Sequence, residues 1–361
     1  MLLLMPCGFI ILRSSKLFIQ LHGKENSMLF RFIFVVLLAF SSFLSVAQTQ
    51  DSPIALVIHG GAGTITKERM TDSMEVAYQQ KLMEAIDAGY TILENGGTGL
   101  EAIKVAINIM ENSPLFNAGK GAVFNHEGKN ELDASVMHGE SKSAGAVAGV
   151  HHIKNPIDAA IAVMQNSKHV MMAGEGAEKF AKEQGIELVD ADYFYTKRRY
   201  EQLKNARNRS QQQGYNALPY QDYKYGTVGA VALDKYGNIV AGTSTGGMTN
   251  KQYGRVGDSP IIGAGTYAYN ETCGISATGH GEYFIRSVAA YDVSALMKYK
   301  SYTIEKAGQE VIKKIEKLGG KGGLVGLDRH GNVMMSFSTE GMYRGYRKKG
   351  GETVILIYGN N

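Results

Sequence analysis

The sequence predicts an α/β domain of four layers, in which two stacked β-sheets are covered by helices on both outer faces. Two hairpin segments, 230–248 and 324–342, align with each other without gaps. Two segments of helical spacing lie between them. Strands, then helices, then strands again favour sheets packed face to face with helices outside. The chain has 361 residues, 44% hydrophobic and 20% charged, so it can bury a large core.

Apolar spacing predicts the elements of the first half. An apolar run at 54–58 ends in the glycine loop 59–63, which is typical of a buried strand entering a tight turn. Helical and alternating patterns, with Gly and Pro at their ends, then predict helices at 74–95, 99–112, 155–166 and 174–184, and strands at 123–124, 131–137 and 144–150.

The second half begins with a polar stretch. Residues 195–226 are rich in Arg, Gln and Tyr and are interpreted as an exposed linker, helical in part at its start. Both hairpins carry an Asp-x-x-Gly-Asn turn, and the predicted helices between them cover 282–297 and 303–318. Position 227 of the first hairpin corresponds to Lys321 in the second, so the hairpin itself does not require a Thr there.

The N-terminal region is predicted to be a leader, residues 1–47. A basic start at Met28, an apolar run and Ser45-Val-Ala47 indicate a secretory signal peptide at 28–47, too short to span a bilayer. Residues 1–27 are interpreted as a mis-assigned extension, with the start at Met1 or Met28 left open. Gln48 in place of a Cys argues against a lipoprotein. We expect an exported, periplasmic protein without a membrane anchor after signal removal.

Charge and cysteine content exclude some functions. The net charge is +4, and the leader contributes +3 of it through Arg13, Lys16, Lys24 and Arg31 against Glu25. Neither nucleic acid nor an anionic membrane is therefore an expected partner. Cys7 lies in the leader, which leaves Cys273 without an intrachain partner, so we expect no disulfide.

Three chemistries compete for the glycine- and hydroxyl-rich loops. Residues 242–246 match the G-x-S-x-G pattern of α/β-hydrolases. In those enzymes a helix follows the motif directly, whereas residues 247–254 have a composition that does not favour a helix. Gly279-His-Gly281 precedes a helix and is a weak candidate anion loop without a nucleotide fingerprint. The nine His residues show no metal-ligand spacing.

The third chemistry makes Thr227 the first residue of a new chain. A Thr hydroxyl needs a neighbouring base, and a free α-amine with a pKa near ~8 can serve its own residue. This requires cleavage between Gly226 and Thr227, where a glycine and the preceding polar linker suit a chain break.

Further motifs occur in order along the chain. They are 58–63 (IHGGAG), 115–119 (LFNAG), 131–137 (ELDASVM), 226–234 (GTVGAVALD), 243–247 (TSTGG), 254–260 (GRVGDSP), 263–265 (GAG) and 278–282 (TGHGE). Together they resemble the plant-type L-asparaginase/isoaspartyl peptidase family of N-terminal-nucleophile hydrolases, from about residue 54 to the C-terminus. The resemblance implies an αββα sandwich, self-cleavage into an α chain (48–226) and a β chain (227–361), and a homodimer of such αβ units.

The resemblance also implies roles for single residues. Thr227 is the implied nucleophile, with Thr245 beside its hydroxyl and Asn117 supporting it. Thr278 and Gly279 are the implied oxyanion hole. For the substrate, Arg255 would hold the α-carboxylate, and Asp258 with the Gly281 carbonyl would hold the α-ammonium; Gly279 also lines this site.

A structural sodium ion is implied as well, and no cofactor for catalysis. Its ligands would be backbone carbonyls of the loop at 110–120, those of Met110, Glu111, Ser113, Phe116, Ala118 and Lys120. Lys120 departs from the small or apolar residue expected at its position.

The expected activity is hydrolysis of β-aspartyl (isoaspartyl) dipeptides and L-asparagine to L-aspartate, through an acyl-enzyme on Thr227. The preference between these substrates stays open. One alternative is a glycosylasparaginase of the same fold, although those enzymes usually carry Asp before the Thr. Another is an uncleaved, exported amino-acid-binding protein that uses Arg255 and Asp258.

Overall fold

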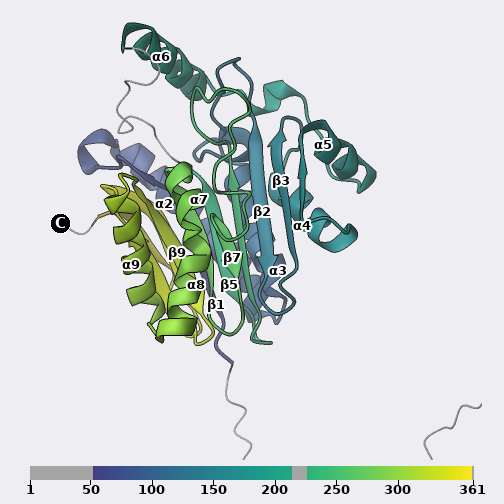
Figure 1. The fold of residues 1–361 in the computed structure, drawn as a ribbon, viewed down its shortest axis with the longest axis vertical. Coiled ribbons are helices and arrows are strands. Elements are labelled where there is room, and N and C mark those ends of the chain that lie inside the picture. The colour runs from purple at the N-terminus through teal and green to yellow at the C-terminus, as the bar shows by residue number, and fades with distance from the viewer. Residues whose placement is uncertain (1–51, 214–225, 360–361) are drawn as a thin grey trace, which may run out of the picture. The chain divides into compact units, whose positions relative to one another are not determined.

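The computed structural model describes residues 52–213 and 226–359, which form a unit with two β-sheets (Figure 1). The strand order is β12-β11-β1-β5-β6-β2-β3-β4 in the larger sheet and β10-β9-β8-β7 in the smaller. Strands β3 and β4 pair parallel, and the other neighbours pair antiparallel. The predicted leader, with its signal peptide at 28–47, lies outside the described residues.

The strands of the larger sheet are β1 (Ala55–Gly63), β2 (Leu132–His138), β3 (Ala144–Val150), β4 (Met171–Ala173), β5 (Val228–Leu233), β6 (Ile239–Thr245), β11 (Gly341–Lys348) and β12 (Val354–Tyr358). The smaller sheet consists of β7 (Thr266–Ala268), β8 (Cys273–Gly279), β9 (Gly322–Asp328) and β10 (Val333–Phe337). The helices are α2 (Asp72–Glu94), α3 (Gly99–Glu111), α4 (Pro156–Asn166), α5 (Gly174–Glu183), α6 (Lys197–Gln213), α7 (Gly281–Ser287), α8 (Ala289–Lys300) and α9 (Ile304–Lys317).

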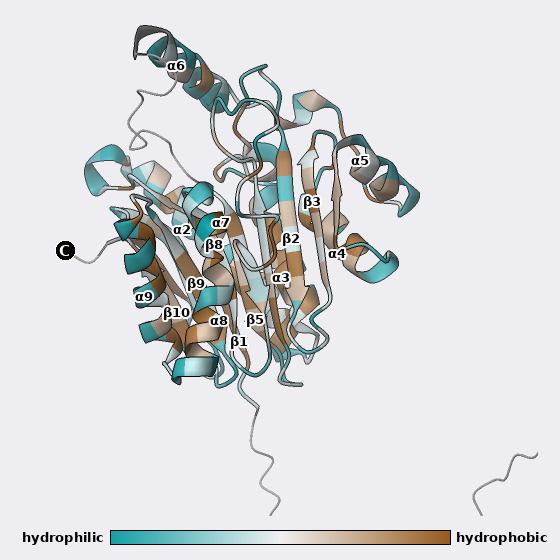
Figure 2. Cartoon of the chain, viewed as in Figure 1, coloured by the Kyte–Doolittle hydropathy of each residue, from teal (hydrophilic) through white to brown (hydrophobic). Residues whose placement is uncertain are grey.

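Three hydrophobic clusters separate four layers. Ile86 of α2 and Ile103 of α3 belong to the cluster between these helices and the larger sheet. Val57 and Leu327 belong to the cluster between the two sheets. Val311 of α9 belongs to the third, beneath α8 and α9, which lie over the smaller sheet in Figure 1. Figure 2 shows hydrophobic residues along the strands that these helices cover. The predicted αββα sandwich is confirmed.

Asp residues in the hairpin turns explain why both repeats fold alike. The Asp234 carboxylate accepts hydrogen bonds from the backbone N–H groups of Tyr236 and Asn238, each at 3.0 Å. Asp328 binds the N–H groups of His330 and Asn332 in the same way, at 2.8 and 2.9 Å. These Asx turns close each strand pair. The first hairpin, β5–β6, lies in the larger sheet, and the second, β9–β10, lies in the smaller one.

Two predicted elements are corrected. The single helix expected at 282–297 is two helices, α7 and α8, because Val288 adopts a left-handed conformation with φ 48° between them. The strand expected at 123–124 is an isolated bridge between Phe124 and Asn130. The strands β4, β7 and β8 and the C-terminal pair β11–β12 were not among the predicted elements.

The predicted exposed linker is a helix over much of its length. Helix α6 buries Arg199, Leu203 and Ala206, which are spaced four and three residues apart and so lie on one face. The prediction of exposure is therefore wrong for this face, whereas residues 214–225 lie outside the described part. Within the described ranges, no helix is long and apolar enough to cross a membrane.

Candidate active site

Thr227 lies directly before β5, in the middle of the larger sheet. Strand β5 pairs with β6 so that Val228 stands opposite Ser244, which places Thr227 beside Thr245. The Thr227 Oγ1 donates a hydrogen bond of 3.0 Å to the Thr245 Oγ1, and that oxygen also accepts the Gly247 N–H at 3.0 Å. Thr227 and Thr245 are 7% and 3% exposed. The candidate nucleophile is thus held in one orientation, away from most solvent.

The Gly226 carbonyl is also fixed. The Asn117 backbone N–H donates to the Gly226 oxygen at 2.9 Å. The Asn117 side chain donates to the Gly247 oxygen at 2.7 Å and accepts the Val123 N–H at 2.9 Å. A Cβ added to Gly226 would lie 2.8 Å from the Asn117 Cβ, so only glycine fits this contact. Asn117 therefore holds the carbonyl that precedes Thr227.

Thr278 and Gly279 end β8 of the smaller sheet. A Cβ added to Gly274 of β8 would contact Val231 of β5, so residue 274 lies over residue 231. A Cβ added to Gly229 of β5 would contact Ser276 of β8, so residue 276 lies over residue 229. Alternate residues of a strand share a face, and this spacing places Thr278 over Thr227. The Thr278 hydroxyl is fully buried and has no hydrogen-bond partner among the described residues. It is a free donor facing the candidate nucleophile.

Arg255, Asp258 and Gly281 converge at one point. A Cβ added to Gly281 would lie 2.8 Å from an Arg255 nitrogen (Nη2) and 2.9 Å from the Asp258 Oδ1. The Asp258 Oδ2 is buried without a hydrogen-bond partner in the described part of the chain. Burial raises the pKa of Asp258 to about 7, against the opposing charge of Arg255. A buried carboxylate oxygen without a hydrogen-bond partner suits an ammonium group.

Glu282 holds Arg255. The Arg255 Nε and Nη2 donate to the two Glu282 carboxylate oxygens at 2.8 and 2.9 Å. This two-pronged contact fixes the plane of the guanidinium. Prediction from sequence missed this partner, although Glu282 closes the motif 278–282. Because Glu282 takes the Nε N–H and one of the two Nη2 N–H groups, the second Nη2 N–H and both N–H groups of Nη1 remain for a ligand.

The chain is similar to known proteins over most of its length. The model of the asparaginase family matches residues 52–357. The chain is 48% identical to the isoaspartyl peptidases of Salmonella typhimurium, over 84% of this chain and 98% of that protein, and of Escherichia coli, over 84% and 95%. It is 38% identical to the plant-type L-asparaginase of Pyrococcus abyssi, over 82% and 97%.

The chain belongs to the asparaginase family. This confirms the resemblance that the motifs indicated. In this asparaginase-family chain, every residue implied for catalysis or substrate binding lies within the described ranges. The contacts above join Thr227, Thr245, Gly226 and Asn117 in one group and Arg255, Asp258 and Gly281 in a second.

Asp133 connects the two groups. It stands opposite Thr245 in the pairing of β2 with β6, and its charge interacts with those of Arg255 and Asp258. Buried Lys251 lies 3.2 Å from the Glu131 carboxylate and 4.0 Å from that of Asp133. Burial raises the pKa of Asp133, while Lys251 opposes this shift. The cluster was missed because its members look like ordinary strand and loop residues in sequence.

A buried hydrogen-bond chain runs between the sheets from His59. The His59 Nε2 lies 2.8 Å from the Ser276 hydroxyl, and that hydroxyl lies 2.7 Å from the Thr243 hydroxyl. The chain continues through Thr266 and Ser135 to the Ser259 carbonyl, at 2.6, 2.8 and 2.6 Å. Burial lowers the pKa of His59 to about 3, so its ring is neutral at physiological pH. This chain connects the neighbourhood of β5 with the residue after Asp258.

Glu111 anchors the end of α3. Its carboxylate accepts from the Ser244 hydroxyl at 2.6 Å, from the Asn155 amide at 2.9 Å and from the Ile157 N–H at 3.1 Å. Burial raises the pKa of Glu111 to about 8. Because Ser244 precedes Thr245, this carboxyl group ties the strand of the candidate site to two helices.

The loop 110–120 fits a hard monovalent cation. A Cβ on Gly119 would overlap the Glu111 carbonyl oxygen, and a Cβ on Gly121 would overlap that of Phe116. Glycine at both positions therefore allows these carbonyl oxygens to approach the turn closely. Carbonyl oxygens are the ligands that such ions take. The Lys120 side chain points to the Tyr193 ring, 5.2 Å from its centre, and leaves the backbone free to serve. The described residues contain no cluster of His, Cys, Asp or Glu suited to a metal.

Proposed function

We propose that this chain is an isoaspartyl peptidase with L-asparaginase activity, activated by its own cleavage between Gly226 and Thr227. The family consists of amidohydrolases, and the chain is an enzyme of this class. The observation that carries the proposal is a pair of hydrogen bonds: the Thr227 hydroxyl donates to the Thr245 hydroxyl, and the Gly226 carbonyl accepts from the Asn117 backbone N–H. The fixed geometry supports attack by this hydroxyl.

Self-cleavage is proposed to begin with attack of the Thr227 hydroxyl on the Gly226 carbonyl carbon. A C–O bond forms, the C–N bond breaks, and the hydroxyl proton ends on the Thr227 nitrogen. The Asn117 N–H already donates to the oxygen that becomes negative during this step. Water then hydrolyses the ester, which leaves a carboxylate on Gly226 and a free amine and hydroxyl on Thr227.

The mature reaction is proposed to use the same hydroxyl on a β-aspartyl carbonyl. The Thr227 amine takes the hydroxyl proton and returns it to the leaving amine. The Thr278 hydroxyl and the Gly279 N–H would stabilise the oxyanion, and such a donor contributes about 3–4 kcal/mol. Water releases L-aspartate from the acyl-enzyme. This role accounts for the unpartnered Thr278 hydroxyl.

The substrate headgroup is proposed to lie between Arg255 and Asp258. The α-carboxylate would bind the Arg255 guanidinium, whose orientation Glu282 fixes. The α-ammonium would bind the unpartnered Asp258 Oδ2. An ammonium here would compensate the buried charge and lower the pKa of Asp258 from about 7.

The relatives support this substrate class. Those of the bacteria named above are called isoaspartyl peptidases, and those of Danio rerio and Mus musculus, 39% and 37% identical, isoaspartyl peptidase/L-asparaginases. Neither glycosylasparagine hydrolysis nor simple amino-acid binding gains support from these names. The ratio of kcat/KM on a β-aspartyl dipeptide, L-asparagine and glycosylated asparagine tests the assignment. Dominance of the glycosylated substrate would overturn it.

Intact-mass analysis tests self-cleavage. The purified chain is expected to separate into two fragments, the second beginning at Thr227. The Thr227→Ala variant is expected to remain whole and inactive, with Thr249→Ala, a substitution outside the described contacts of the site, as the matched control that still cleaves. Cleavage of Thr227→Ala at the same bond would show that another protease performs the step.

Three further features are proposed on the grounds given from the sequence. They are export to the periplasm, a homodimer of αβ units, and a sodium ion held by the carbonyls of loop 110–120. N-terminal sequencing of the exported protein, light scattering, and thermal unfolding in sodium against choline buffer test them in turn. A start other than Gln48, a monomeric mass, and equal melting temperatures are the respective contrary results.

A further inference from the structure

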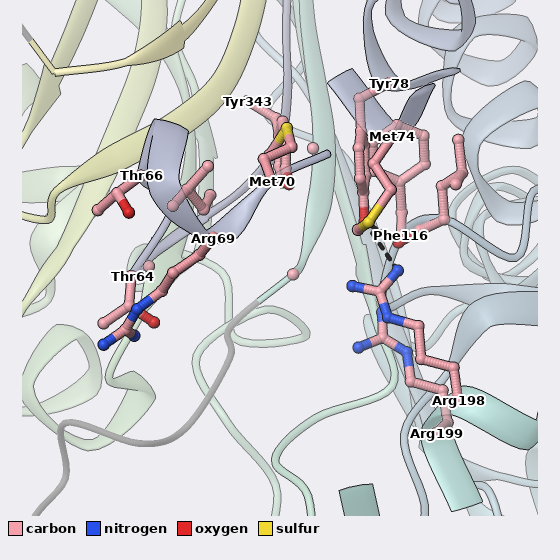
Figure 3. Close-up of a pocket in the computed structure, with 15 residues that line it drawn as sticks. Thr64, Thr66, Arg69, Met70, Met74, Tyr78, Phe116, Arg198, Arg199 and Tyr343 are labelled. Carbon is pink, nitrogen blue, oxygen red and sulfur yellow. Dashed lines mark hydrogen bonds between the residues drawn. The ribbon is translucent and has the colours of Figure 1, made fainter. Parts of the chain in front are cut away.

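A hollow of about 60 Å³ lies beside Gly226 (Figure 3). Its lining comes from β1 and the residues after it, α2, the loop before Asn117, α6 and β11: Gly60, Gly63, Thr64, Ile65, Thr66, Arg69, Met70, Met74, Tyr78, Leu115, Phe116, Arg198, Arg199, Gly226 and Tyr343. None of the catalytic or substrate-binding residues assigned above lines it. The hollow is therefore distinct from the proposed substrate site.

Arg198 and Arg199 form one wall of this hollow. Figure 3 shows both guanidinium groups directed toward Tyr78 and Phe116. The Arg198 Nη1 donates to the Tyr78 hydroxyl at 3.2 Å. The Arg199 Nε donates to the Gly121 carbonyl at 2.8 Å, and its Nη1 donates to the Gln202 amide oxygen at 3.2 Å. All of these acceptors are neutral.

The positive charge on this wall is uncompensated. Arg255 and Arg347 have carboxylate partners in the structure, but within the described ranges Arg198 and Arg199 have none. Arg199 is 4% exposed, and burial together with the charge of Arg198 lowers its pKa to about 10. Two adjacent guanidinium groups, one of them buried, are costly without an anion. The wall is therefore suited to a negatively charged ligand.

Gly226 is the lining residue from which an anion would arise. Before cleavage its carbonyl is part of an amide and carries no charge. If the proposed cleavage occurs, hydrolysis adds one oxygen to that carbon and releases a proton, which produces a carboxylate. A planar carboxylate matches the fork of a guanidinium. Both arginines lie at the start of α6, in the same α chain that would end at Gly226.

We propose that this hollow binds the α-carboxylate of Gly226 after cleavage, through Arg198 and Arg199. This inference rests on the proposed self-cleavage. Binding would draw the new carboxylate from beside the Thr227 amine, where it would otherwise pair with the ammonium and occupy space needed by the substrate. The arginine pair is thus a site for the product of self-cleavage, which the hydrolysis of substrates does not itself require.

Protection of the new C-terminus from a serine carboxypeptidase tests the proposal. The fully cleaved wild-type enzyme and the Arg198→Gln/Arg199→Gln variant are incubated with the protease, and intact mass follows loss of Gly226 from the α chain. We expect removal to be about tenfold slower or more in the wild type, because charge-assisted hydrogen bonds protect the terminus. Arg329→Gln, an exposed arginine in the β9–β10 turn, is the matched control and should behave as the wild type.

A competition on the wild type keeps the test valid if the double variant does not fold. N-acetylglycine carries the same carboxylate as the new terminus and should speed removal of Gly226, whereas N-acetylglycinamide should not. Equal removal rates in all conditions would overturn the carboxylate site. A chain that never separates into two fragments would instead contradict the proposed self-cleavage, and mass analysis shows this before protease is added.

Discussion

The Nε2 of His59 and the hydroxyl of Ser276 lie 2.8 Å apart and join β1 of the larger sheet to β8 of the smaller one. Both residues are fully buried. The His59 Nδ1 has no hydrogen-bond partner among the described residues, and the Thr227 backbone offsets only part of the lowering of the His59 pKa by burial. A neutral imidazole therefore lies between the strand of the proposed nucleophile and the opposite sheet.

This contact predicts an acid-sensitive contribution to stability. The pKa of His59 is lowered to about 3 in the folded protein, and the unfolded chain takes up the proton near pH 6.5. Between these values the unfolded state binds more protons, so stability falls as the pH falls, by about 1.4 kcal/mol per pH unit for this group. Urea unfolding of the wild type and His59→Gln from pH 7 to 4 measures the difference. Parallel curves would contradict the prediction.

The tight packing around Gly229, two residues after the proposed nucleophile, leaves no room for a side chain. A Cβ at this position would overlap the Ser276 hydroxyl and lie 2.5 Å from the His59 Nε2. Gly229→Ala is therefore expected to lower the free energy of unfolding by about 1–3 kcal/mol or more. Gly176→Ala is the control, because it lies in α5 with nothing within 4 Å and should stabilise by about 0.5–1 kcal/mol. Equal effects would refute the crowding.

Removing the charge of Asp258 is expected to raise stability and to weaken substrate binding. Burial raises its pKa from 3.8 to about 7, so holding it charged above pH 7 destabilises the fold by up to about 4 kcal/mol. Asp258→Asn is expected to unfold at higher urea concentration than the wild type at pH 8, while KM rises by about tenfold or more through loss of a charged partner. Unchanged KM would remove Asp258 from the ammonium site.

The same carboxyl group predicts a pH dependence of binding. Protonation below about pH 7 removes its charge, so the wild-type kcat/KM is expected to fall with decreasing pH through this region. The fall in kcat should occur at lower pH than the fall in kcat/KM, because kcat reports the complex, in which the substrate ammonium lowers the pKa of Asp258. A kcat/KM profile that is flat from pH 8 to 5 would be the contrary result.

Replacement of Glu282 is expected to change KM with little effect on kcat. Its carboxylate holds two nitrogens of Arg255 but contacts neither Thr227 nor Thr278 in the described structure. Glu282→Gln keeps the shape and weakens the charge-assisted contact, so KM should rise by about three- to tenfold. Glu305→Gln, at the exposed start of α9, is the control. A large loss in kcat at unchanged KM would assign Glu282 to the chemical step.

Local patterns predicted most of the elements, whereas the residues proposed for the site came from the resemblance of motifs spread along the chain to a known family. The Asx turns of the hairpins and the ends of α2 to α5 follow from short-range chemistry, which one sequence displays. The His59–Ser276 contact and the Asp133–Lys251 cluster depend on how strands 100 residues or more apart align, which no local pattern contains. The buried face of α6 was visible in its spacing, but the polar composition obscured it, since one inward residue is an arginine.

The two hairpins show one strand geometry in two settings. In the first copy, the residue before the strand is Thr227, the candidate chain end. In the second, it is Lys321, whose carbonyl accepts the His280 N–H and lies directly behind Gly279. The repeated hairpin thus carries the proposed nucleophile on one sheet and lies behind the proposed oxyanion donors on the other. Changes at Lys321 should then alter the rate of the chemical step more than the position of Thr227, an asymmetry between two hairpins of the same shape.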